Sequence, residues 1–198
     1  MNPTEIREIF DRYGVLQNGH FRLSSGRHSD VYLQCQRVLE HPRLTASLGE
    51  AIAERFDGRH GAHPEFNVVV SPAVGAILIG NAVAYAAGTR FFFAERVNGA
   101  MTLRRGQQLG RSDRALIVED VITTGGSAAE VAALAESCGA AVIGVGSLVD
   151  RSVHKPAFRL ESLVRVEARD YEESACPLCA AGEPLTAPGS RYLAKDAS

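Results

Sequence analysis

The sequence has no excess of either charge and no apolar run long enough to cross a bilayer. Its 198 residues carry 21 lysines and arginines against 23 aspartates and glutamates, a formal net charge of −2 at pH 7. A protein that binds nucleic acid through its overall field would show a basic excess, which this chain lacks. No stretch reaches the roughly 20 apolar residues of a membrane-spanning helix, and no basic segment followed by an apolar one opens the chain. We therefore expect a cytoplasmic protein without nucleic-acid or membrane partners.

Cysteine is scarce, and its spacing gives little sign of a metal site. Cys35 and Cys138 lie in apolar stretches and are expected to behave as small core residues. Cys176 and Cys179 form a single CPLC, whereas a structural zinc site normally takes four protein ligands. Because a second matched pair is lacking, metal binding would require distant residues or another chain. Two reduced thiols in a C-terminal turn are the favoured interpretation.

Three histidines are candidate ligands or bases: His20, His28 and His154. None has the spacing of a zinc motif. His28 could touch a substrate, and the other two are expected in loops. We assign no chemistry to them and expect no metal ion held by protein ligands.

Strand and helix patterns alternate along most of the chain. The first helix is expected to follow Asn2 as N-cap and to end at Gly14, because apolar residues recur at helical spacing between them. A half-buried strand around 31–35, a second helix at 42–56 and a surface loop at 57–65 come next. Further strands are predicted at 66–72, 90–96, 114–119 and 141–150, with helices at 73–88 and 127–139. This alternation predicts an α/β fold with a central parallel sheet flanked by helices.

The segment 97–113 is a long stretch without a convincing period. It carries three arginines, Arg104, Arg105 and Arg111, and several glycines. Loops of this length are uncommon inside compact domains and are often lids or binding loops. An exposed β-hairpin with solvated charges explains the segment equally well, and both interpretations stay open.

The stretch EDVITTGGS, residues 119–127, combines paired acids with a Thr/Gly turn. It follows a predicted strand and precedes a predicted helix, so its backbone N–H groups and hydroxyls could bind an anion at a helix N-terminus. A capping box formed by Ser127 and Glu130 is the purely structural alternative, but it leaves the acids and threonines unexplained. Ionised carboxylates accept hydrogen bonds, and a vicinal diol donates two. Glu119 and Asp120 could therefore hold a ribose diol while the turn holds its 5-phosphate.

A hydrophobic run, two acids and a Thr/Gly turn together resemble the phosphoribosyl pyrophosphate (PRPP) signature of the type I phosphoribosyltransferases. Within that group the chain resembles the orotate phosphoribosyltransferases over nearly its whole length. FRLSSGRHSDVYLQC is similar to that family's substrate hood, SPAVGAI to its pyrophosphate loop and LVDR to a strand end with an orotate-binding arginine. CPLCAAGEPLTAPGSR is similar to the C-terminal tail of one bacterial branch.

The resemblance implies a single phosphoribosyltransferase domain over 1–198. Its parts would be a helix and hood at about 1–40, an α/β core at 66–150 with a mobile lid at 97–113, and a tail at 170–198. It also implies Mg²⁺ bound through PRPP, and a homodimer whose lid reaches the neighbouring site. The implied reaction transfers ribose 5-phosphate from PRPP to N1 of orotate in pyrimidine biosynthesis.

Site residues carried over from this resemblance fall into three groups. The orotate group is Thr123 and Arg151. The catalytic group, which combines the acid pair with lid arginines, is Glu119, Asp120, Arg96, Arg104 and Arg105. The PRPP group is Glu119, Asp120, Val121, Ile122, Thr123, Thr124, Gly125, Gly126 and Ser127, with Val74 and Gly75 on pyrophosphate.

The chain departs from the better-known branch of the family at two places. That branch has a lysine in the hood, where this chain has Ser24, and an arginine and lysine at the start of the lid, where this chain has Glu95 and Arg96. Since the lid has no lysine, its arginines are expected to do the electrostatic work. Two alternative functions stay open: transfer to another base, and a regulator that senses PRPP without catalysis.

Overall fold

The structure, a computed structural model, describes residues 1–23, 25–57, 64–154 and 157–188. Ser24, most of the predicted loop at 57–65 and the last ten residues of the predicted tail lie outside the described residues. Among the described residues, no helix combines the length and the apolar character needed to cross a bilayer.

The larger of two sheets has six strands in the order β5–β4–β3–β6–β7–β8, and all but one neighbouring pair are parallel. The exception is the antiparallel hairpin of β4 and β5 at one edge. The strands are β3 (Val68–Pro72), β4 (Arg90–Val97), β5 (Ala100–Leu103), β6 (Arg114–Ile122), β7 (Ala141–Asp150) and β8 (Leu160–Arg165). The predicted parallel α/β sheet is confirmed.

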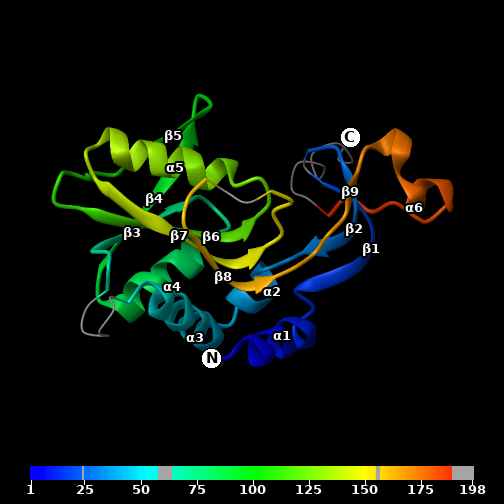
Figure 1. Cartoon of the computed structure of the whole chain (residues 1–198), viewed down its shortest axis with the longest axis horizontal. Coiled ribbons are helices and arrows are strands. Elements are labelled where there is room, and N and C mark those ends of the chain that lie inside the picture. Colours follow the sequence, from blue (N-terminus) through cyan, green and yellow to red (C-terminus); the bar gives the residue numbers. More distant parts are fainter. Residues whose placement is uncertain (24, 58–63, 155–156, 189–198) are drawn as a thin grey trace.

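Helices cover both faces of this sheet, as Figure 1 shows. Helix α5 (Gly126–Ser137) packs on one face over a core that includes Ile117 and Val131. Helices α3 (Pro42–Ala53) and α4 (Ile77–Ala87) pack on the other, over a core that includes Leu48 and Val118. The β-branched, fully buried strand β3 is typical of a sheet covered on both sides.

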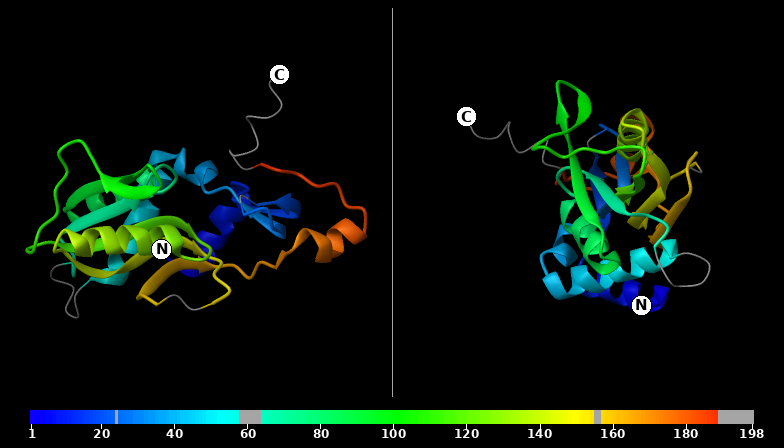
Figure 2. Two further views of the ribbon diagram at one scale, coloured as in Figure 1. Left: turned by 90° about the horizontal axis from the view of Figure 1, so that it is seen from above. Right: turned by 90° about the vertical axis from the view of Figure 1, so that its left-hand side faces the viewer.

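A smaller antiparallel sheet forms the hood at one end of the molecule. It consists of β1 (Leu16–Arg22), β2 (His28–Leu33) and the short β9 (Asp170–Tyr171), in the order β1–β2–β9. The chain leaves the main sheet after β8, adds β9 to the hood and continues through η2 (Glu173–Ala175) and α6 (Pro177–Ala180). Figures 1 and 2 show the hood and this tail together beyond the main sheet.

The remaining helices link the hood to the main sheet. Helix α1 (Pro3–Arg12) begins with the predicted capping box, in which Asn2 and Glu5 exchange side-chain and backbone hydrogen bonds. Short α2 (Gln36–Leu39) precedes α3, and the 3₁₀ turn η1 (Glu54–Phe56) follows it.

Three details differ from the sequence analysis. The strand expected around 31–35 is β2, which ends at Leu33, so Cys35 becomes the buried residue before α2. Cys138 is exposed rather than a core residue, because α5 ends there and the chain turns away through Gly139. Strands β1, β8 and β9 were not predicted.

The first part of segment 97–113 is the turn and second strand of a hairpin, as one of the two open interpretations predicts.

Candidate active site

Two carboxylates stand at the carboxyl end of β6, near the middle of the main sheet. Alternation along the strand places Glu119 on the side of Ile117 and α5, and Asp120 on the side of Val118, α3 and α4. The two carboxyl groups nevertheless interact at the strand end, where Asp120 helps to raise the pKa of Glu119. The paired acids therefore occupy the edge at which open α/β sheets bind their ligands.

The fold changes the acidity of Glu119. Burial, and then the neighbouring charge of Asp120, raises the pKa of Glu119 to about 9. Glu119 therefore carries a proton at neutral pH in the ligand-free protein and can donate a hydrogen bond. This corrects the sequence argument, which treated both carboxylates as ionised acceptors. The sequence shows that the acids are adjacent, but the burial that raises the pKa of Glu119 comes only from the fold.

The Thr/Gly turn after β6 forms a shallow cradle at the start of α5. A depression of about 100 Å³ is lined by Glu119 and by residues 121–128. Gly125 has φ of 76°, and a Cβ there would lie 3.1 Å from the Phe158 ring, so both conformation and space favour glycine. The N–H of Gly126 donates to Oγ1 of Thr124 at 3.3 Å. The turn thus presents hydroxyls and helix N-terminal N–H groups on one surface.

The capping-box alternative for Ser127 is wrong. The N-cap of α5 is Gly125, which makes no side-chain cap bond, and Ser127 lies inside the first turn with an exposed side chain. Glu130 instead pairs with Arg96, whose Nη1 lies 2.8 Å from Oε2. The Ser127 hydroxyl is therefore on the exposed surface of the cradle.

The loop after β3 lies directly against the acid pair. A Cβ on Gly75 would come within 2.8 Å of Asp120 Oδ2, so only glycine lets the backbone approach this carboxylate. Val74 beside it is 81% exposed, unusual for a valine. The structure therefore brings the predicted pyrophosphate loop and the predicted diol site together.

A larger cavity of about 410 Å³ lies between this strand end and the hood. It shares Val121, Thr123 and Thr124 with the cradle, so the two hollows adjoin each other. Its lining residues come from the hood, from β6 and its turn, and from the segments after β7 and β8. They are Arg22, Leu23, Ser25, Arg27, Tyr32, Leu33, Asp120, Val121, Thr123, Thr124, Arg151 and Asp170. Burial, and then the charge of Asp120, raises the pKa of Tyr32, which places that phenol near the acid pair.

The buried side chain of Arg151 lines this cavity and does not lie on the protein surface. Its side chain is 4% exposed, and its Nη2 donates to Asp170 and to Ser29 Oγ. Its backbone N–H donates to Ile122 O at 2.9 Å, which ties it to the end of β6. Among the described residues its side-chain hydrogen bonds all use Nη2, so Nη1 and Nε remain as donors. The surface-salt-bridge alternative is therefore wrong.

The three lid arginines lie on or just after the β4–β5 hairpin, not in the walls of the two hollows. Arg96 joins the hairpin to the first turns of α5 through Glu130 and bonds Gly99 O at 2.7 Å within the turn. Arg104 and Arg105 both pair with Glu95, at 3.8 and 3.2 Å. Their predicted catalytic role stays a prediction, with Arg96 the one tied to the helix of the cradle.

Comparison with known proteins identifies this arrangement. The family described as "Phosphoribosyl transferase domain" matches residues 34–159. An orotate phosphoribosyltransferase of Caldanaerobacter subterraneus subsp. tengcongensis is 45% identical over 195 residues, covering 98% of this chain and 100% of that protein. One from Desulforamulus reducens is 46% identical with the same coverage. The chain belongs to the orotate phosphoribosyltransferase family.

Solved members of the orotate phosphoribosyltransferase family share the fold. The Mycobacterium tuberculosis H37Rv enzyme, crystallised in complex with 5-phospho-α-D-ribosyl 1-diphosphate, is 26% identical with a TM-score of 0.62. That similarity covers 82% of this chain and 95% of the other. The resemblance inferred from the sequence is confirmed.

Sequence analysis missed several residues of this site. Arg22, Arg27 and Tyr32 line the cavity, and Asp170 pairs with Arg151. The quoted hood segment contains the first three, so the resemblance marked the segment without singling out its members. No sequence pattern marks Asp170 as a site residue, because its role depends on the pairing of β9 with β2.

The histidines and cysteines of the hood and tail are placed differently from the expectation. His20 lies in β1 and is 3% exposed, so it is not a loop residue, and His28 in β2 is fully buried and does not line the cavity. Both rings face Cys176 and Cys179. Metal binding by these cysteines would require distant residues, and the fold brings two such residues, His20 and His28, to them. His154 is exposed and makes no contact of this kind.

Proposed function

We propose that the chain transfers ribose 5-phosphate from PRPP to N1 of orotate, giving orotidine 5′-monophosphate and pyrophosphate, in pyrimidine biosynthesis. One observation carries this proposal: two adjoining hollows place a buried arginine on one side of the acid pair and a Thr/Gly cradle on the other. Family membership and the PRPP complex of a solved relative support the same assignment.

The cradle end suits the sugar phosphate. The 5-phosphate would accept from the N–H groups and hydroxyls of residues 123–127, at the start of a helix whose dipole favours an anion. The diol of the ribose would lie on Glu119 and Asp120. Because Glu119 carries a proton in the ligand-free protein, it can donate to a ribose oxygen while Asp120 accepts from a hydroxyl. Val74 and Gly75 would offer backbone N–H groups to pyrophosphate.

The hood end of the cavity can accommodate a planar ring that carries a carboxylate. Nη1 and Nε of Arg151 remain as donors at the cavity wall, and a planar guanidinium binds a carboxylate with two parallel hydrogen bonds. Thr123, at the junction of the two hollows, would contact both orotate and the ribosyl group. Asp170 and Ser29 fix the orientation of Arg151 before a substrate arrives.

The reaction needs alignment and charge stabilisation more than protein acid–base chemistry. The bond from ribose C1 to pyrophosphate oxygen breaks, and pyrophosphate leaves with the electron pair. N1 of orotate, after release of its proton, forms the new bond to C1 with its own pair. Carboxylates near the sugar favour the positive charge that develops on the ring. Closure of the hairpin would exclude water, which competes for the activated sugar.

Mg²⁺ is the cofactor we propose, bound through PRPP. The carboxylate oxygens of Asp120 at the strand end are of the kind that Mg²⁺ prefers, and few protein ligands are needed for an ion that keeps several waters. When bound, it would neutralise charge on the pyrophosphate leaving group. Full activity after chelation and gel filtration would contradict this part of the proposal.

A homodimer acting in the cytoplasm completes the proposal, and both features rest on the family resemblance. In a dimer the lid arginines would serve the partner's hollow, which agrees with their position outside the hollows of their own chain. Light scattering after size exclusion tests the dimer, and a monomer with full activity would contradict it.

The direct test is turnover of purified protein with PRPP and Mg²⁺ against orotate, uracil and hypoxanthine. We expect loss of orotate absorbance with formation of one pyrophosphate per orotate, and no comparable reaction with the other bases. Preference for uracil or hypoxanthine would instead support transfer to another base. Binding of PRPP without turnover of any base would support a regulator.

A further inference from the structure

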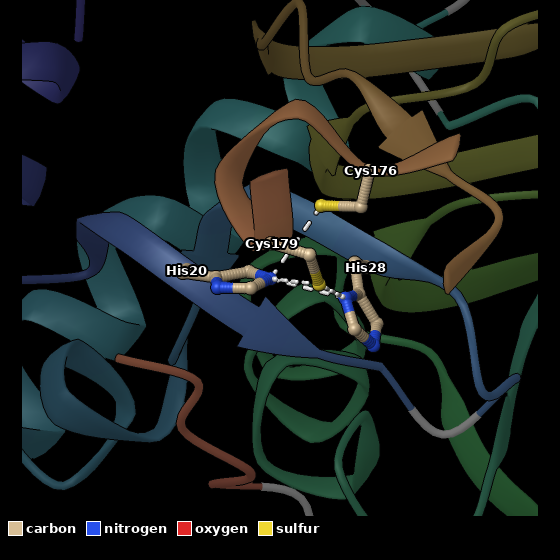
Figure 3. Close-up of side chains that lie close together, drawn as sticks. All are labelled: His20, His28, Cys176 and Cys179. Carbon is tan, nitrogen blue, oxygen red and sulfur yellow. Dashed lines mark hydrogen bonds between the residues drawn. The ribbon is translucent and has the colours of Figure 1, made fainter. Parts of the chain in front are cut away.

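Four side chains that can bind a metal converge where the tail crosses the hood, outside the proposed active site. They are His20 in β1, His28 in β2, and Cys176 and Cys179 around α6, shown in Figure 3. One ligand atom of each lies within 4.8 Å of all the others. Cys35 and Cys138 lie outside this cluster, and none of the four cysteines is in a disulfide.

Four of the six distances between ligand atoms lie within about 0.4 Å of the edges of a tetrahedral zinc site. With Zn–N near 2.0–2.1 Å and Zn–S near 2.3 Å, tetrahedral angles give about 3.4 Å between two nitrogens and about 3.6 Å between nitrogen and sulfur. His20 Nε2 lies 3.0 Å from His28 Nδ1 and 3.5 and 3.6 Å from Sγ of Cys176 and Cys179. Cys179 Sγ lies 3.2 Å from His28 Nδ1. The four atoms are therefore arranged around one point rather than along a chain of hydrogen bonds.

The protonation of His20 supports the same interpretation. Its Nδ1 lies 2.9 Å from the carbonyl oxygen of Glu183, which can only accept, so Nδ1 carries the proton and donates. Nε2 of the neutral ring then presents a lone pair to His28 and the two sulfurs. A backbone carbonyl that orients a histidine in this way is the usual outer partner of a metal-binding imidazole.

The strand geometry places both histidines on one face of the hairpin. His28 pairs with Arg22 across the hairpin, and His20 precedes Arg22 by two residues, so both rings point to the same side. A bulge between Asn18 and Phe21 shifts the register there. Pairing of β9 with β2 at His28 then brings the tail, and with it the CPLC turn, across that face.

Hydrogen bonds of Thr186 to the hood hold the chain beyond α6, but the two short helices have no buried side chain of their own. No residue within η2 or α6 is buried, whereas Cys176 between them is 4% exposed. A segment without an apolar core of its own is commonly stabilised by a metal or a disulfide. Two thiolates and two neutral imidazoles also balance a divalent cation, so the filled site would bury no net charge.

We propose that His20, His28, Cys176 and Cys179 bind one structural Zn²⁺ that fastens the tail to the hood. Soft thiolate and imidazole ligands favour zinc over the hard cations, and four protein ligands leave no open position for catalysis. The exposed Cys179 provides a path by which the ion enters. Binding releases the protons of both thiols, so zinc affinity increases with pH.

The test is metal analysis of the untagged, reduced full-length protein after growth with added zinc. We expect one zinc per chain in the wild type, much less than one in Cys179→Ser, and almost none in Cys176→Ser/Cys179→Ser. Cys138→Ser, which removes an exposed cysteine outside the cluster, is the matched control and should keep its zinc. Zinc that persists in the double variant would overturn the proposal.

A measurement on the wild type alone covers the case in which the variants do not fold. Chelation should make two further thiols reactive, and Co²⁺ added to the stripped protein should give the intense visible bands of a tetrahedral thiolate site. Wild-type protein that contains no stoichiometric zinc and takes up neither Zn²⁺ nor Co²⁺ would overturn the proposal.

Discussion

The two ends of the molecule build their sites in different ways. At the carboxyl end of β6, the acid pair and the cradle come from nine consecutive residues, and the strand–turn–helix order fixes their positions. At the hood, Arg151 meets Ser29 and Asp170, and the zinc cluster joins residues 20 and 28 to 176 and 179. A contiguous site can be found by a motif, whereas an assembled site depends on strand pairing. The contiguous site at the end of β6 should therefore determine the binding of the sugar phosphate. The assembled site at the hood should determine which base is accepted.

Removal of the charge of Asp120 should have the largest effect. Asp120→Asn keeps the size of the side chain but weakens stabilisation of the positive sugar, and we expect kcat to fall by about 10²–10³-fold. Glu50→Gln, an exposed change on α3, is the control and should leave kcat unchanged. Steady-state kinetics with circular dichroism as a folding check would measure this. Full activity of folded Asp120→Asn would contradict the diol role.

The lid arginines should affect rate more than PRPP binding. We expect Arg96→Gln, or the triple change with Arg104 and Arg105, to lower kcat by about 10–100-fold, the effect of losing one charged hydrogen bond. The KM for PRPP should change much less. Arg114→Gln, at the opposite end of β6 from the site, is the control. If neither single nor combined lid changes slow the reaction, these arginines have no catalytic role.

Loss of the proposed zinc should loosen the hood and leave the cradle intact. His28 is adjacent to Arg27 and Ser29, of which one lines the cavity and the other holds Arg151. We expect Cys179→Ser to raise the KM for orotate by roughly 3–10-fold, or about 1 kcal/mol, with the KM for PRPP nearly unchanged. Cys138→Ser should change neither value. Equal increases in both KM values would show that the tail supports the whole fold rather than the hood.

The raised pKa of Glu119 should appear as a pH-dependent change in stability. Its folded pKa of about 9 lies above its ordinary value of 4.5, so the folded state holds a proton that the unfolded state has lost. The associated stability is complete below about pH 4.5 and is lost as pH rises toward and through 9. Glu119→Gln avoids this loss, so its Tm relative to wild type should rise steadily from pH 5 to pH 9. A Tm difference that is constant with pH would contradict the assignment.

Most of the fold could be predicted from periodicity, but the assembled parts could not. The buried β-branched run of β3 and the capping box at Asn2 have local causes, and both were found. Strand β9 is two residues long and exists because it pairs with β2, so no local sequence pattern predicts it. Asp170 and the histidine partners of the CPLC turn were missed for that reason. The protonation of Glu119 was missed because burial is a property of the packed sheet.

The most direct test of the difference between the two ends is the pair of KM values for Arg151→Gln. We predict that the KM for orotate rises by about 10–100-fold, the cost of a lost charged hydrogen bond, while the KM for PRPP stays within about twofold. Arg151→Gln/Asp170→Asn removes the carboxylate left without its partner and should show the same split. An unchanged KM for orotate in the folded variants would contradict the assignment of the hood end to the base.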